Sequence, residues 1–182
     1  AALTRPIVSV AALTLMEEGK IQLTDPVSRF LPQIKGLQVS VAQRDASGGA
    51  TTFKMMPAER DITVLDLMRH TSGITYGERS PNKPVHEAYK VNGLELAPFR
   101  LTRQQFVEGL AKSPLMAQPG TTFEYGLSTD LLGAVIENMR NIALSTTVTL
   151  LLPTERHANA NGLVGTVTGL AGFVSYFNYR ID

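Results

Sequence analysis

The sequence contains no cysteine, and this absence excludes several kinds of chemistry. Without thiols there is no disulfide framework, no thiolate nucleophile and no cysteine-ligated metal, and the redox compartment is left open. The chain also lacks a glycine-rich phosphate loop, a G-x-S-x-G elbow and an H-E-x-x-H motif, and its three histidines show no ligand spacing. We therefore expect no metal, nucleotide or other cofactor.

A charge excess of one sign is missing as well. The formal net charge is +1 over 182 residues, with acidic and basic residues interspersed, so nothing indicates a nucleic acid or an anionic membrane as a partner. The longest apolar run, Pro6 to Met16, is too short to span a bilayer and is interrupted by Ser9 and Thr14. No signal-peptide pattern precedes it, so cytoplasmic and periplasmic locations both stay open, as does the oligomeric state.

The composition is that of a globular domain. Hydrophobic residues make up 43% of the chain, and a domain of this length buries roughly two-thirds of its unfolded surface. Helix and strand patterns alternate without a repeat. We expect a helix over residues 3–18, a hairpin over residues 37–53, and helices that begin after Thr63, after Thr102 and near Ser128.

Two further segments carry weaker patterns. The segment after Gly73 contains several prolines and glycines and is expected to be a loop. It includes Ser80 and Lys83 at S-x-x-K spacing, which we interpret as a chance match because they lie between prolines in a polar stretch. The tail has aromatic and β-branched residues from Phe173 onward, which favour a strand.

The helix over residues 3–18 contains a single cation, Arg5, in its first turn. Because the helix is apolar on nearly every face, we expect it in the interior of the protein. One class of serine hydrolase places a serine and a lysine one turn apart at the start of such a helix. A serine hydroxyl is a poor nucleophile until a base takes its proton, and one helical turn brings that base to the oxygen.

Three long stretches and one weaker stretch carry a resemblance to a known family. In chain order they are "ALTRPIVSVAALTLMEEGKIQLTDPVSRFLP", "ITVLDLMRHTSGITYG", "PGTTFEYGLSTDLLGAVIE" and, more weakly, "TGLAGFVSYFNY". They resemble the serine β-lactamase and penicillin-binding-protein superfamily, within the class C-like branch that includes the family VIII carboxylesterases. The three strong stretches cover about residues 2 to 137 and keep the order of the family.

The resemblance implies a set of site residues. Ala2 falls on the nucleophilic serine of the S-x-x-K helix, and Arg5 falls on its lysine. Tyr125 matches the tyrosine that serves as general base and proton shuttle, and we expect it beside the first turn of the opening helix. The substrate-binding positions implied are Leu127, in the third place of the tyrosine motif, and Thr168 and Gly169, in the last triplet. His70 in "RHTSG" is also a family hallmark, which we interpret as a structural residue at a helix end.

The resemblance also implies the fold. We expect an α+β, β-lactamase/transpeptidase-like fold with a helical region packed on an antiparallel sheet. Residues 1–182 would form a single β-lactamase-like domain that is partial, without the strands before the serine helix and without much of the middle helical region of the family. The chain is thus expected to be truncated relative to the family.

Two functions stay open at this point. The first is hydrolysis of small-molecule carboxylic esters, or of β-lactams, through an acyl-enzyme. Esters are favoured because the last triplet lacks a cation and Leu127 replaces the usual asparagine. The second is a catalytically silent homologue that binds a ligand or assembles with a partner, because Ala2 has no hydroxyl group and a guanidinium stays protonated at neutral pH.

Overall fold

Short helices and one pair of strands make up the structure, a computed structural model that describes residues 4–44, 51–95 and 101–151. The elements are α1 (Thr4–Glu17), η1 (Val27–Arg29), η2 (Pro32–Ile34), β1 (Gln38–Gln43), β2 (Thr52–Pro57), α2 (Val64–Arg69), η3 (Gly77–Arg79), α3 (Lys83–Val91), α4 (Arg103–Ala111) and α5 (Ser128–Leu151). Helices together with antiparallel strands make this an α+β fold, as expected from the sequence.

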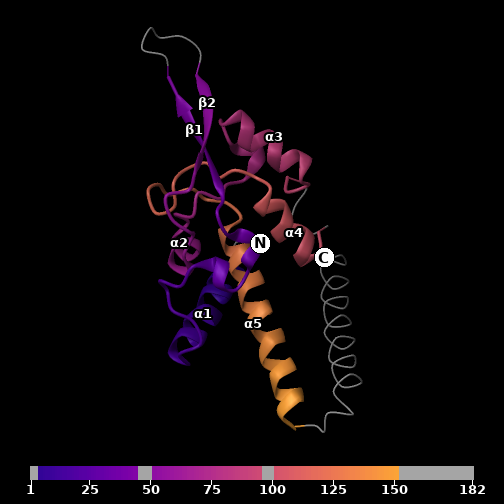
Figure 1. Cartoon of the computed structure of the whole chain (residues 1–182). Coiled ribbons are helices and arrows are strands. Elements are labelled where there is room, and N and C mark those ends of the chain that lie inside the picture. The colour runs from indigo at the N-terminus through magenta and orange to yellow at the C-terminus, as the bar shows by residue number, and fades with distance from the viewer. Residues whose placement is uncertain (1–3, 45–50, 96–100, 152–182) are drawn as a thin grey trace. The chain divides into compact units, whose positions relative to one another are not determined.

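The chain divides into two compact units, residues 1–136 and residues 137–182. The first unit contains all of the elements up to α4 and the first turns of α5 (Figure 1). Of the second unit, the structure describes only the continuation of α5. No helix of the described residues is long and apolar enough to cross a membrane.

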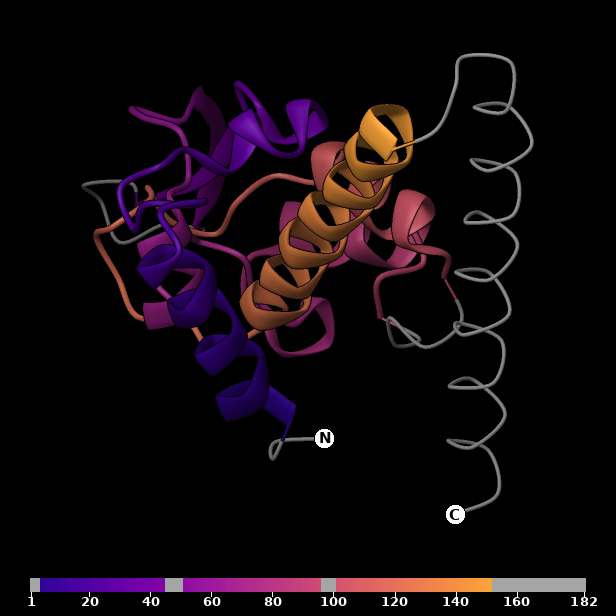
Figure 2. The same cartoon turned by 90° about the horizontal axis from the view of Figure 1, so that it is seen from below.

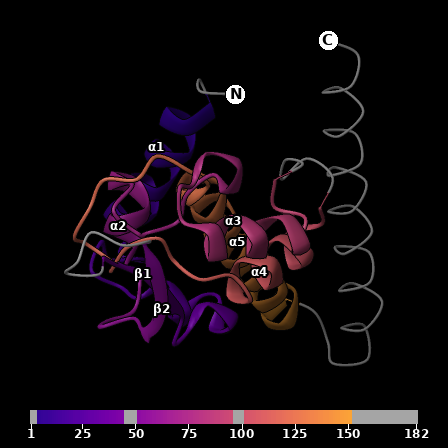
Figure 3. The ribbon, with the colours of Figure 1, turned by 90° about the horizontal axis from the view of Figure 1, so that it is seen from above.

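The predicted hairpin is confirmed. β1 and β2 pair antiparallel with Gln38 opposite Pro57 and Gln43 opposite Thr52. Along β1, Gln38 is exposed, but Val39 and the neighbouring Ser40 are both buried, so burial does not follow the strict alternation expected of a strand with one covered face. On the other side of β1, Val39 forms a parallel bridge with Leu115, which ties the hairpin to the segment after α4 (Figure 3).

Two helix starts also follow the sequence patterns. Thr63 and Asp66 form a capping box at the start of α2, and Thr102 and Gln105 form one at the start of α4. In each box, the threonine hydroxyl accepts a hydrogen bond from the backbone N–H of the residue three positions later. The side chain of that later residue accepts a hydrogen bond from the backbone N–H of the threonine.

α3 was not predicted, because its prolines favour a loop. Pro84 lies in the first turn of the helix, where a missing N–H removes no intrahelical hydrogen bond. Asn82 caps the helix and is itself buried, with its side chain bonded to both the hydroxyl and the carbonyl of Ser40. Lys83 is the first residue of α3 and is exposed, so the segment is not the loop expected from the sequence.

The prediction for the opening helix was right about its bounds and wrong about its burial. α1 ends one residue before the expected position, and Gly19 follows at a φ of +70°, which glycine adopts at low cost. Among the apolar residues of α1, Ala12 is fully buried, but Ile7, Val10 and Leu13 are exposed. An apolar helix pattern predicts that a helix is buried by packing against other segments. The pattern does not show which segment would pack there.

Candidate active site

The guanidinium of Arg5 is the centre of a cluster of polar and aromatic groups. Its Nη1 donates to the carbonyl of Gly126 at 3.1 Å and to the hydroxyl of Thr129 at 3.4 Å. Its Nη2 donates to the Tyr76 hydroxyl. Its Cζ lies 4.4 Å from the centroid of the Tyr125 ring, which is cation–π distance. The first turn of α1 therefore meets the start of α5 and the loop before it (Figure 2).

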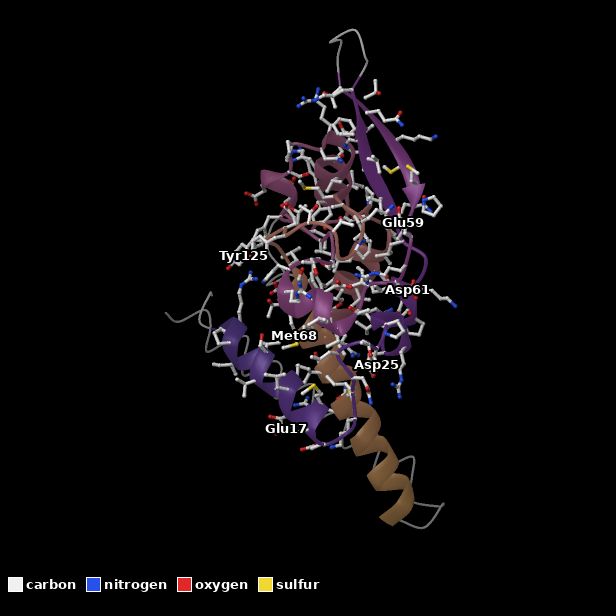
Figure 4. All side chains as sticks on the ribbon, turned by 90° about the vertical axis from the view of Figure 1, so that its left-hand side faces the viewer. Glu17, Asp25, Glu59, Asp61, Met68 and Tyr125 are labelled. Carbon is white, nitrogen blue, oxygen red and sulfur yellow. The ribbon has the colours of Figure 1, made fainter. Side chains whose placement is uncertain are left out.

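Tyr125 is positioned by the segment that leads into α5. The N–H of Glu124 donates to the carbonyl of His70 at 2.7 Å, which ties the segment to the end of α2. Directly after Tyr125, the backbone of Gly126 packs so closely that a Cβ there would lie 2.4 Å from the carbonyl carbon of Thr75. Tyr125 itself is 43% exposed and lies at the outer edge of the molecule in Figure 4. Its ring is thus held in place on a surface that a small molecule can reach.

A buried hydroxyl pair fixes the start of α5. The hydroxyls of Ser72 and Ser128 are 2.9 Å apart, and both residues are fully buried. Ser72 also accepts the N–H of Ile74 at 3.1 Å. Because buried polar groups are stable only when they are hydrogen-bonded, this pair holds the α5 start against the segment after α2.

His70 lies at the end of α2, as expected, and it also belongs to the cluster. Its Nε2 is 3.3 Å from Nη1 of Arg5 and 3.4 Å from the hydroxyl of Thr129. Its ring centroid is 4.9 Å from that of Tyr125 and 6.0 Å from that of Phe123. Burial lowers the pKa of His70, and the positive charge of Arg5 lowers it further. The imidazole is therefore neutral at neutral pH.

The charge of Arg5 is not neutralised by a direct ion pair with a described carboxylate. Asp130, in the first turn of α5, is the acid whose pKa Arg5 influences. Burial raises the pKa of Asp130, and the positive charge of Arg5 opposes that rise. In the described part of the chain, the cluster therefore presents a cation held by neutral acceptors and aromatic faces.

Comparison with known proteins identifies the family to which this arrangement belongs. The family model named Beta-lactamase matches residues 1–152. The chain belongs to the Beta-lactamase family. It is 33% identical to an uncharacterized protein of Mycobacterium tuberculosis over 144 residues. The matched segment covers 79% of this chain and 33% of that protein. It is also 31% identical to Esterase EstB of Burkholderia gladioli over 153 residues. That matched segment covers 84% of this chain and 34% of the esterase.

Solved structures show the same fold for this member of the Beta-lactamase family. It is similar to EstCE1, a hydrolase with promiscuous acyltransferase activity, with a TM-score of 0.57 and 31% sequence identity over 77% of this chain and 32% of that chain. It is also similar to the LovD6 mutant of simvastatin synthase from Aspergillus terreus, with a TM-score of 0.53 and 27% identity over 76% of this chain and 30% of that chain. The chain spans about a third of the length of these relatives.

The structure brings together two of the site residues that the sequence predicted for this Beta-lactamase family chain, Arg5 and Tyr125. Leu127 is buried, at 1% exposed, directly before α5. Ala2, Thr168 and Gly169 lie outside the described residues, as does the strand expected from Phe173. The catalytic and binding roles of all these residues remain predictions.

Sequence reasoning missed two members of the cluster. The Tyr76 hydroxyl accepts a hydrogen bond from Arg5, and Thr129 contacts both Arg5 and His70. Their signal was present in the stretches "HTSGITYG" and "EYGLSTD", which match the family throughout rather than only at the tyrosine motif. Among the described residues, no group of three or more histidines, aspartates and glutamates could hold a metal ion.

Proposed function

We propose that this chain supplies the cation and tyrosine of a serine-hydrolase site that acts on small carboxylic esters through an acyl-enzyme. The observation that carries the proposal is the contact of Arg5 with the ring of Tyr125, at 4.4 Å from Cζ to the ring centroid. These two residues stand at the lysine and tyrosine positions of the family. The printed names of an esterase and of a hydrolase with acyltransferase activity among the relatives support an ester as the substrate.

The proposed reaction requires a serine in place of Ala2, and the hydroxyl of that serine adds to the ester carbonyl. The serine proton passes through the phenol of Tyr125 to the leaving alcohol, and the C–O bond to that alcohol breaks. Water then hydrolyses the acyl-serine and releases the acid. A guanidinium is a permanent cation in proteins, so the part of Arg5 is electrostatic stabilisation of developing negative charge.

Position 2 determines whether the covalent step takes place. Ala2 has no hydroxyl, and removal of a nucleophilic serine costs on the order of 10⁶ in turnover, or roughly 8 kcal/mol of transition-state stabilisation. This residue favours a second candidate function, an ester-binding homologue that does not turn over. β-Lactams are the alternative ligand class for either function.

Labelling with a fluorophosphonate probe, read by intact mass, separates the two candidates. We expect no adduct on the chain with Ala2, and we expect a stoichiometric adduct on the double variant Ala2→Ser/Arg5→Lys, which restores both the nucleophile and a cation that can deprotonate. Hydrolysis of a p-nitrophenyl butyrate substrate should appear together with the adduct. An adduct on the unaltered chain would remove the silent candidate.

A matched control tests the role of the tyrosine. Adding Tyr125→Phe to the double variant keeps the ring beneath the cation but removes the hydroxyl, so labelling should slow by roughly 10²- to 10⁴-fold, as for loss of a general base. Far-UV circular dichroism confirms that each variant folds. Failure of the folded double variant to label at high probe concentration would refute the serine-hydrolase proposal for this chain.

A further inference from the structure

His70 is held in a conformation that is unfavourable in two respects. Its φ is +55°, in the left-handed region that residues other than glycine adopt uncommonly, although asparagine, aspartate and histidine adopt it more often than most. In addition, its Nδ1 is buried and has no hydrogen-bond partner among the described residues. A glycine at the end of α2 would avoid both the positive-φ cost and the unpaired Nδ1. These costs make the contacts of the other ring nitrogen the ones to consider.

That other nitrogen, Nε2, faces the cation of the site. It lies 3.3 Å from Nη1 of Arg5, which can only donate a hydrogen bond. The contact is attractive only if Nε2 is unprotonated, so the ring proton must be on Nδ1. The Thr129 hydroxyl, 3.4 Å from both Nη1 and Nε2, accepts from Arg5 and can donate to the same Nε2.

We propose that His70 is a positioning residue whose neutral imidazole accepts a hydrogen bond from Arg5 at Nε2 and so keeps the guanidinium over the ring of Tyr125. The ring of His70 also stacks on that of Tyr125 at 4.9 Å, so one side chain contacts both members of the pair. The consequence for catalysis rests on the proposed function. The contact itself does not.

The groups that surround His70 make the contact sensitive to its charge. Arg5 approaches from α1, the ring of Tyr125 from the loop before α5, and Thr129 from α5, where Asp130 is the next residue. Glu124 presents its backbone N–H to the His70 carbonyl, while its carboxylate accepts from Thr75. A proton added at Nε2 would replace the acceptor with a donor and place two positive charges side by side.

The first test is the titration of His70 in the full chain, followed by two-bond ¹H–¹⁵N correlation spectra. We expect the Nδ1–H tautomer at neutral pH and a midpoint below that of an ordinary histidine. Arg5→Gln should raise the midpoint by about half a unit to one unit, because a like charge is removed. Arg69→Gln removes an exposed cation one residue from His70 in sequence, and it should shift the midpoint by less than about 0.2 units because solvent screens it.

The second test measures the position of Arg5 when the acceptor is removed. His70→Phe keeps an aromatic ring without an acceptor, whereas His70→Gln keeps a carbonyl oxygen that can accept from Arg5. Both variants retain a Cβ at the positive φ, so their backbone costs match. The Arg5 side-chain N–H resonances should remain dispersed in His70→Gln and collapse toward those of a free arginine in His70→Phe.

Three outcomes would overturn the proposal: an Nε2–H tautomer at neutral pH, a His70 midpoint that Arg5→Gln leaves unchanged, or dispersed Arg5 resonances in a folded His70→Phe variant. The first two measurements leave His70 unaltered, so they stand even if the substitutions at His70 prevent folding. None of the readouts needs turnover. Failure of fluorophosphonate labelling would thus count against the serine-hydrolase proposal and leave the role of His70 intact.

Discussion

Asp66 allows the sharpest test of the forces that hold the described fold together. Its carboxylate accepts two hydrogen bonds from Arg60, at 2.6 and 2.9 Å, and one each from the Thr63 N–H, the Thr63 hydroxyl and the Thr71 hydroxyl. The carboxylate is nearly buried, at 6% exposed. It therefore joins the start of α2 to its end and to the segment that carries Arg60.

The magnitude follows from the charge state. Burial alone would raise the pKa of Asp66, but the hydrogen bonds from Arg60, Thr63 and Thr71 outweigh burial and lower the pKa from 3.8 to about 2. At about 1.4 kcal/mol for each pKa unit, this corresponds to about 2 kcal/mol of folding free energy. Because the folded-state pKa is depressed, this contribution is fully present above about pH 4 and is lost as the pH falls toward 2.

Asp66→Asn removes the charge and should lower the free energy of unfolding by about 2 kcal/mol or more at pH 7. The measurement is urea unfolding followed by far-UV circular dichroism between pH 2 and pH 7. The difference from the unaltered chain should shrink as the pH falls and nearly vanish at pH 2. Asp25→Asn is the control, because the Asp25 carboxylate accepts from the exposed Arg29 and from the Gln22 N–H, at 2.8 Å each, against five hydrogen bonds at Asp66, so its loss should cost about 1 kcal/mol or less.

The refuting result is a variant that keeps the pH dependence of the unaltered chain. If the stability of Asp66→Asn still falls steeply between pH 4 and pH 2, other carboxylates carry the acid sensitivity, and the hydrogen bonds of Asp66 do not set its charge state. An effect at Asp25 as large as that at Asp66 would contradict the reasoning in a second way, because the larger number of hydrogen bonds to Asp66 would then not account for its contribution to stability.

Two further contrasts can be measured by thermal and urea unfolding. Gly126→Ala should destabilise by about 2 kcal/mol or more, because its Cβ meets the backbone of Thr75 at 2.4 Å. Gly133→Ala, with nothing within 4 Å of its Cβ on the helix, should stabilise by about 0.5 to 1 kcal/mol; equal effects would contradict the close packing. Asn82→Ala should cost about 2 to 4 kcal/mol, because it leaves buried groups unpaired, whereas Thr102→Ala, an exposed cap, should cost about 1 kcal/mol. A cap at Thr102 as costly as that at Asn82 would show that burial does not set the difference.

The parts of the fold that were predicted from sequence are those whose signals are local. The cap at Thr63 and the capping box at Thr102 need only residues within one helical turn, and the hairpin needs only alternation and a turn. α3 was missed because its cap is not local. Asn82 is hydrogen-bonded to Ser40, which lies 42 residues earlier in the chain. The local sequence around the prolines does not predict that contact.

The candidate site also has one part that was predicted from the sequence and one part that was not. The contact of Arg5 with Tyr125 joins residues 120 positions apart, and no periodicity predicts it. It was expected only because whole stretches of the chain resemble a family in which those positions meet. Tyr76 and Thr129 lie within the same stretches but outside the motif positions, so the resemblance gave them no role, and their part in the cluster came from the geometry alone.

The surroundings of Arg5 leave its charge without a directly bonded carboxylate among the described residues. It lies at the start of α5, where the helix dipole is positive, and beside an imidazole that is neutral at neutral pH. A carboxylate bonded to it would be more favourable for stability but would cancel the charge. Neutral acceptors and the face of Tyr125 hold the guanidinium without cancelling it. Under the proposed function, its positive potential would stabilise an ester carbonyl that gains negative charge, as a site for acyl transfer requires.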